Sequence, residues 1–185
     1  QLYVTGYSCG AALATLFAFE AAAQPDSIVP KPVSLFSIGS PCVGDDGFSK
    51  SFQSLETLGK LRALRVVNKK DIMPLMPKMS SFALFKHTGM TLNLYNEEDQ
   101  YAVSYPTVKS YKSCDTDMFG GLVDGWDQVL LSSLASTPES QIGLVEHSLR
   151  EYNLRLLLSR LPLETASLND LYTQPELVGR LVPEI

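Results

Sequence analysis

Ser8 lies in a Gly-x-Ser-x-Gly pattern, since residues 6–10 read Gly-Tyr-Ser-Cys-Gly. An apolar run from Leu2 predicts a short buried strand before this pattern, and small residues predict a helix after it. A serine between a strand and a helix in this pattern is typical of a nucleophile elbow, which raises the hydroxyl above the sheet. We expect Gly6 and Gly10 to give the strand and the helix room to approach closely. Ser8 is therefore the predicted nucleophile, near the positive end of the helix dipole.

A serine nucleophile needs an imidazole to take its proton and a carboxylate to orient that imidazole. The chain has two histidines. His87 opens a predicted strand, where its ring would pack or hydrogen-bond within the sheet. His147 precedes a predicted helix late in the chain, in a loop-like position. We therefore predict His147 as the base, with a helix cap as its alternative role.

Asp71 is the predicted carboxylate, because it follows directly after a predicted strand at residues 61–68. The order Ser, Asp, His along the chain is the order found in α/β-hydrolases. Asp45 and Asp46 compete with it, but they follow an earlier strand and are expected to cap a helix. Asp124 lies in a loop with no strand predicted before it. The alternative for Asp71 is a solvated turn residue beside two lysines.

Cys9 directly follows Ser8, and its backbone N–H is the predicted donor to the oxyanion of the reaction. Its thiol would turn away from the substrate in such an elbow, so we do not expect Cys9 to be the nucleophile. Together with Cys42 and Cys114 the chain has three cysteines, without metal-ligand spacing. A disulfide framework is not expected, although a single bridge stays open.

The order of predicted elements indicates an α/β fold with a mostly parallel sheet and flanking helices. Further strands are predicted at residues 33–38, 61–68 and 87–95. Helices are predicted at residues 11–24, 47–58, 126–134 and 146–161. The last helix is expected to place its apolar side chains together, namely Leu149, Tyr152, Leu156 and Leu157. Ligands of such sheets bind beyond the carboxyl ends of the strands, where Ser8 and Asp71 fall.

The composition is that of one globular domain, with 185 residues, 45% hydrophobic and 19% charged. A net charge of −5 argues against a nucleic-acid partner. No apolar run reaches the roughly 18 residues that a transmembrane helix needs. Because a strand is predicted from Leu2, we expect residues 1–162 to be the C-terminal part of a domain whose N-terminal strands are missing. Residues 163–185 would be a tail with at most a short helix.

Five segments resemble the fungal-type, or class 3, triacylglycerol lipases. Residues 6–14 (GYSCGAALA) are similar to the elbow GHSLGGALA of that family, and residues 36–44 (FSIGSPCVG) to its FGSPRVG segment. Residues 66–74 (VVNKKDIMP) resemble its VNxxDxVP segment. Residues 87–92 and 146–152 resemble its HVGxxL and HxxxxY segments.

The resemblance implies an α/β-hydrolase fold, a lipid ester substrate, hydrolysis through an acyl-enzyme, and no metal or organic cofactor. It also implies that Asp71 and His147 match the acid and base of the family, whereas the histidine matched by His87 is not catalytic there. Tyr7 stands where the family has a histidine, so the packing next to the serine differs. The family's second oxyanion donor and its lid precede the segments matched here.

The sequence thus predicts a serine ester hydrolase for acylglycerols or related glycerolipids, which such an enzyme meets at a membrane or lipid-droplet surface. Two alternatives stay open. A catalytically impaired lipase-like fragment, or a remnant that binds lipid or protein, would keep the fold without turnover. An acyltransferase would use the same residues, with an alcohol in place of water releasing the acyl group.

Overall fold

The computed structural model describes residues 1–76, 85–94, 101–104, 138–158 and 168. Within these residues one sheet has the strand order β1-β2-β3-β4-β5. Its strands are β1 (Leu2–Tyr7), β2 (Val33–Ile38), β3 (Leu61–Asn68), β4 (Met90–Leu94) and β5 (Tyr101–Ser104). Strands β1 to β4 are parallel, and β5 pairs with β4 in the antiparallel direction. The predicted parallel sheet is confirmed, and β5 is a strand that the weak periodicity of its segment did not reveal.

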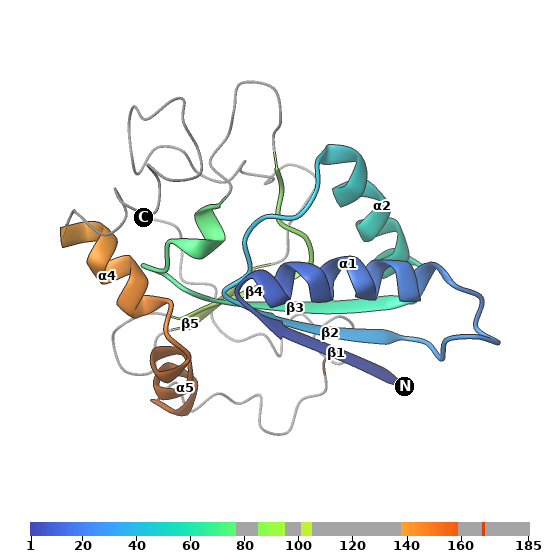
Figure 1. The fold of residues 1–185 in the computed structure, drawn as a ribbon. Coiled ribbons are helices and arrows are strands. Elements are labelled where there is room, and N and C mark those ends of the chain that lie inside the picture. The colour runs from blue at the N-terminus through green and yellow to red at the C-terminus, as the bar shows by residue number, and fades with distance from the viewer. Residues whose placement is uncertain (77–84, 95–100, 105–137, 159–167, 169–185) are drawn as a thin grey trace.

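Helices lie on both faces and at one end of this sheet (Figure 1). They are α1 (Cys9–Ala23), α2 (Asp46–Thr57), a short 3-10 helix η1 (Met73–Leu75), α4 (Pro138–Glu146) and α5 (Leu149–Leu158). Figure 1 shows α1 and α2 together above the sheet, and α4 and α5 near the end opposite the N-terminus. That end carries the carboxyl ends of the parallel strands, where the predicted site residues fall.

Two apolar clusters hold the layers together, one on each face of the sheet. The first packs α1 and α2 on the sheet, and its buried members include Ala18, Val33, Leu35, Phe52 and Leu61. The second lies on the opposite face, where Tyr152 of α5 packs with Leu64, Val66, Met90, Leu92 and Leu94. Ala63 and Leu64 belong to different clusters because successive residues of a strand point to opposite faces. The chain thus has the α/β fold of the prediction, with a mostly parallel sheet.

Strand β1 is less buried than predicted. It is an edge strand of the described sheet, and the side chain of Tyr3 is 64% exposed. The predicted strand at residues 87–95 begins later, at Met90. Gly89 has a φ of +80°, in the left-handed region that a strand does not use, so His87 lies before the strand.

The predicted helix at residues 146–161 is wrong in its start, because helices α4 and α5 meet at His147 and Ser148. Ser148 caps the start of α5, since its hydroxyl accepts a hydrogen bond from the Glu151 N–H at 3.3 Å. Leu149 and Leu157 are also not in the core, because they are 54% and 69% exposed. Only Tyr152 is fully buried among the four apolar residues expected together, and Leu156 packs beside it.

Other predicted segments cannot be placed on this fold. The helix at residues 126–134 lies outside the described residues, as does the tail at 163–185 apart from residue 168. In the part of the chain that is described, no helix combines the length and apolar character of a membrane span.

Candidate active site

Ser8 stands at a sharp turn between β1 and α1. Its φ of 58° and ψ of −133° lie outside the regions that non-glycine residues ordinarily adopt. Two hydrogen bonds of 2.9 Å fix this conformation: the Ser8 N–H donates to the Ile38 carbonyl, and the Ser8 carbonyl accepts from the Ala11 N–H. Strained backbone of this kind persists only where the surroundings determine it, and it is common at functional sites.

The close approach of β1 and α1 depends on one of the two glycines. A Cβ at Gly6 would lie 2.3 Å from the Gly10 carbonyl oxygen, so the expected role of Gly6 as a spacer is confirmed. Apart from its neighbours in α1, a Cβ at Gly10 would meet no atom of the described residues within 4 Å, so the same expectation for Gly10 is wrong. It is the backbone of Gly10, and not its missing side chain, that needs the room.

His147 forms hydrogen bonds with both Ser8 and Asp71. Its Nε2 lies 2.9 Å from the Ser8 hydroxyl oxygen, and its Nδ1 lies 2.8 Å from Asp71 Oδ2. The three residues come from the β1–α1 turn, the loop after β3 and the junction of α4 and α5. The carboxylate accepts from an Nδ1–H, which leaves the lone pair of Nε2 to accept from the serine hydroxyl. The structure thus brings together the three side chains that the sequence singled out.

The Asp71 carboxylate is fully buried and has two further donors. The Tyr152 hydroxyl donates to Oδ2 at 2.6 Å, and the Met73 N–H donates to Oδ1 at 2.8 Å. Burial, together with the charge of Asp71, raises the pKa of Tyr152, so the phenol stays a donor at any ordinary pH. From the helical periodicity, Tyr152 was predicted only as a core residue. The resemblance of residues 146–152 to the HxxxxY segment is the signal that could have marked Tyr152 as a site residue.

The backbone around His147 is held by side chains at the ends of the strands. The Asn68 side-chain N–H donates to the Glu146 carbonyl at 2.8 Å, and the Tyr7 hydroxyl donates to the His147 carbonyl. Gly39, with a φ of +57°, lies against the hydrogen-bonded pair of Asp71 and His147. A Cβ at Gly39 would be 3.1 Å from both Asp71 Oδ2 and His147 Cε1. Asn68 and Gly39 were not predicted as site residues, although both lie in segments that resemble the lipase family.

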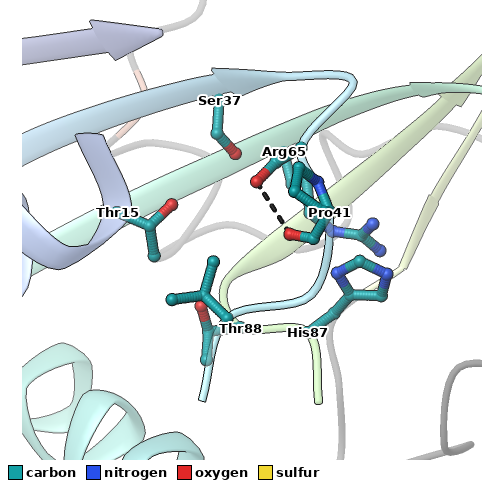
Figure 2. Close-up of a pocket in the computed structure, with 8 residues that line it drawn as sticks. Thr15, Ser37, Pro41, Arg65, His87 and Thr88 are labelled. Atoms are coloured by element: carbon teal, nitrogen blue, oxygen red, sulfur yellow. Dashed lines mark hydrogen bonds between the residues drawn. The ribbon is translucent and has the colours of Figure 1, made fainter. Parts of the chain in front are cut away.

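His87 lies in a different environment. Its Nε2 donates to the Pro74 carbonyl at 2.7 Å. Burial, and then the charge of Arg65, lowers the pKa of His87 well below its usual range, so the ring is neutral. His87 and Arg65 line a small polar pocket with Ser37 and Thr88 (Figure 2). Neither Ser8, Asp71 nor His147 lines this pocket.

The competing carboxylates have structural roles where they are described. Asp45 caps α2, since its Oδ1 accepts from the Phe48 N–H at 2.9 Å. Asp46 forms ion pairs with Lys50 and Lys86, which lower the pKa of its carboxyl to about 2. Asp124 lies outside the described residues.

The cysteines described by the structure differ in state. Cys9 is free and exposed, whereas Cys42 forms a disulfide bond, so the single bridge that the sequence left open is present. The Cys9 N–H begins α1 and therefore has no acceptor within that helix. Within the described residues, no group of three or more His, Cys, Asp or Glu side chains could hold a metal ion.

An arrangement of this kind can carry out acyl transfer. A serine hydroxyl bonded to a neutral imidazole can give up its proton to the ring while its oxygen attacks a carbonyl carbon. A buried carboxylate on the other nitrogen fixes the tautomer and stabilises the imidazolium that forms.

A mostly parallel sheet with helices on both faces, together with a strained serine between β1 and α1, defines an α/β-hydrolase-like protein. Residues 1–81 match the family model described as "Lipase (class 3)". Over these residues the chain is similar to the class 3 lipase family.

Individual proteins are similar over part of the chain. Phospholipase A1-II 3 of Oryza sativa subsp. japonica is 38% identical over 107 residues, which is 55% of this chain and 24% of that protein. Phospholipase A1-II 5 of Oryza sativa subsp. indica is 34% identical over 127 residues, or 66% of this chain and 26% of that protein. The chain thus spans about a quarter of the length of these curated relatives. Lipase II from Rhizopus niveus matches with a TM-score of 0.42 and 33% identity, over 50% of this chain and 33% of that one.

Proposed function

We propose that this protein is a serine ester hydrolase of the lipase type, which cleaves acylglycerol or related glycerolipid esters. The observation that carries the proposal is the position of His147, with Nε2 2.9 Å from the Ser8 oxygen and Nδ1 2.8 Å from Asp71. The similarity of residues 1–81 to the class 3 lipase family supports a lipid ester as the substrate.

The first half of the proposed reaction acylates the serine. The Ser8 oxygen attacks the ester carbonyl carbon while the Ser8 proton moves to Nε2 of His147. The Cys9 N–H donates to the oxyanion of the tetrahedral intermediate, and Asp71 stabilises the imidazolium. The bond to the alcohol then breaks, the alcohol leaves with the proton from Nε2, and the acyl group stays on Ser8.

The second half returns the enzyme to its starting state. Water gives one proton to Nε2 of His147, and its oxygen attacks the acyl carbonyl. Collapse of the second tetrahedral intermediate breaks the bond to Ser8, which recovers its proton from Nε2. The products are one alcohol and one carboxylic acid, and no cofactor takes part.

The names of the relatives narrow the substrates to be tested first. The two rice proteins are called phospholipases A1, so a glycerophospholipid belongs in the panel beside a triacylglycerol. Release of fatty acid from each lipid, presented in mixed micelles, compares the two head groups directly.

The nucleophile is tested with a fluorophosphonate probe on the protein that carries this chain. We expect the wild type to be labelled and Ser8→Ala to be unlabelled. Two controls should keep the label: Ser54→Ala, at an exposed position of α2, and Cys9→Ala, because the proposed oxyanion donor of Cys9 belongs to its backbone.

Two outcomes would overturn the proposal. Labelling that persists in Ser8→Ala would assign the reactive group to another residue. A folded wild type that neither takes the label nor releases fatty acid would favour the lipid- or protein-binding remnant.

A further inference from the structure

Tyr7 contacts both the ring and the backbone of His147. The two rings are stacked, with centroids 4.9 Å apart and an angle of 18° between their planes. The Tyr7 hydroxyl also donates to the main-chain carbonyl of His147. A single side chain therefore restricts the tilt of the imidazole and the position of its backbone.

These contacts join two segments that are far apart in the sequence. Tyr7 directly precedes Ser8 at the end of β1, whereas His147 lies between α4 and α5. The backbone of this junction is also held at the preceding residue, where Asn68 at the end of β3 donates to the Glu146 carbonyl. Two successive carbonyls are thus fixed from two different strands of the sheet.

The environment of Tyr7 suits a permanent donor. Its ring lies edge-on to that of Tyr152, with centroids 6.4 Å apart and an angle of 78°. Burial, and then the negative charge of Asp71, raises the pKa of Tyr7, so its hydroxyl keeps its proton. The stacked face of a neutral phenol also favours a cation above it, which is what the imidazole becomes when it takes the serine proton.

We propose that Tyr7 is a positioning residue for the reaction: it stacks on His147 and holds its carbonyl, and thereby keeps Nε2 in line with the Ser8 hydroxyl. This inference rests on the function proposed above. It gives a specific role to the position at which the chain departs from the histidine of the family elbow.

Three substitutions separate the parts of this role. Tyr7→Phe keeps the stack and removes the hydrogen bond, Tyr7→Leu removes both, and Tyr7→His restores an aromatic ring with an N–H donor. Tyr3→Leu is the matched control, because Tyr3 lies on the same strand with a side chain that is 64% exposed.

The measurements are kcat and KM for a soluble short-chain ester, the rate of fluorophosphonate labelling, and thermal unfolding. We expect Tyr7→Leu to lower kcat roughly 100-fold at unchanged KM, because small misplacement of a catalytic group has effects of that order. Loss of one hydrogen bond in Tyr7→Phe should lower kcat about fivefold. Tyr7→His should recover most of the loss in Tyr7→Leu, and Tyr3→Leu should keep the wild-type kcat.

A second readout does not depend on turnover. The NMR signals of the imidazole of His147, assigned by their loss in His147→Gln, should shift in Tyr7→Leu and stay in place in Tyr3→Leu. If the wild type is not labelled but the His147 signals still shift in Tyr7→Leu, the proposed function is rejected and the contact between Tyr7 and His147 is supported. Unchanged kcat and unchanged signals in a folded Tyr7→Leu, with normal labelling of the wild type, would reject the role of Tyr7 alone. A Tyr7→Leu protein that melts early but keeps its kcat below the transition would also reject it, as a purely structural effect.

Discussion

Gly143 of α4 packs directly against Ile72, the residue that follows Asp71. A Cβ at Gly143 would lie 2.1 Å from Cγ2 of Ile72, closer than real atoms approach. The Gly143 carbonyl in turn accepts a hydrogen bond of 3.1 Å from the His147 N–H. This contact therefore sets the spacing between the helix that leads to His147 and the loop that carries Asp71.

Gly143→Ala should destabilise the protein and disturb the site together. Alanine in place of glycine inside a helix ordinarily stabilises by about 0.5–1 kcal/mol. At this contact we expect a net loss of about 1–3 kcal/mol, because the added methyl overpacks against Ile72. Urea unfolding measures the loss, and the rate of fluorophosphonate labelling should fall as α4 moves away.

The double variant Gly143→Ala/Ile72→Ala is the control for that result. Ile72→Ala removes the clashing Cγ2 and leaves the Cβ, which the added methyl would approach to 3.2 Å. The two substitutions together should therefore be less harmful than their sum. Strict additivity, or a Gly143→Ala protein as stable and as quickly labelled as the wild type, would contradict the contact.

The two glycines of the elbow should respond in opposite ways. Gly6→Ala forces a methyl to within 2.3 Å of the Gly10 backbone, so we expect unfolding or a loss of several kcal/mol with no labelling. Gly10→Ala adds a methyl to the first turn of α1 where the described residues leave space. It should keep the label and a melting temperature at or above that of the wild type. Equal damage from both substitutions would show that the pattern, and not the packing of Gly6, matters.

The sequence predicted the parts of the fold that local patterns encode. The bounds of β2 and β3 agree with the structure, because both strands are apolar runs with clear ends. The junction of α4 and α5 was not predicted, since the side chains of residues 146–161 continue a helical pattern across it. The break comes from the Ser148 cap, which competes with that pattern.

In the candidate site, too, some residues could be predicted from local sequence patterns and others could not. Ser8, Asp71 and His147 could be singled out because their residue types and their positions after strands or before a helix suit one reaction. The supporting contacts of Gly39 and Gly143 could not, since a glycine in a sequence does not reveal which side chain would clash with its Cβ. Such contacts depend on residues that are distant along the chain.

Substitution of Asp71 should affect the reaction far more than substitution of Tyr152, which donates a hydrogen bond to it. Asp71→Asn offers an amide N–H toward Nδ1, which favours the tautomer that cannot accept the serine proton. We expect labelling to slow by roughly 10⁴-fold, a loss of the size found for such a change in serine proteases. Stopped-flow labelling measures this rate.

Tyr152→Phe removes one donor and leaves the His147 bond in place. The loss of a hydrogen bond to a buried carboxylate should cost about 1.5–3 kcal/mol of unfolding free energy. The labelling rate should fall far less than in Asp71→Asn. Tyr3→Phe is the matched tyrosine control, since the Tyr3 hydroxyl donates to the exposed Gln1 side chain at 3.0 Å. A Tyr152→Phe protein as stable as Tyr3→Phe would contradict the assigned hydrogen bond.

The neutral ring of His87 should make the protein less stable in mild acid. Burial and the charge of Arg65 hold the pKa of His87 well below its usual range in the folded state, whereas the unfolded chain binds a proton near pH 6.5. Between these two pKa values the unfolded state carries the extra proton. The unfolding free energy therefore falls as the pH drops below about 6.5, by up to about 1.4 kcal/mol per pH unit from this group. Above about pH 7.5, His87 makes no contribution to the pH dependence of the unfolding free energy.

Urea unfolding of the wild type and of His87→Gln, at pH 8 and at pH 5.5, measures this contribution. Glutamine keeps an N–H for the Pro74 carbonyl but cannot titrate, so His87→Gln should lose less stability between the two pH values than the wild type does. The difference in unfolding free energy between the two proteins at pH 8 serves as the baseline, because at that pH it reflects only the packing cost of the substitution. Equal losses in the two proteins would mean that the folded state protonates His87 as readily as the unfolded chain does, and the neutral state assigned to the ring would then be wrong.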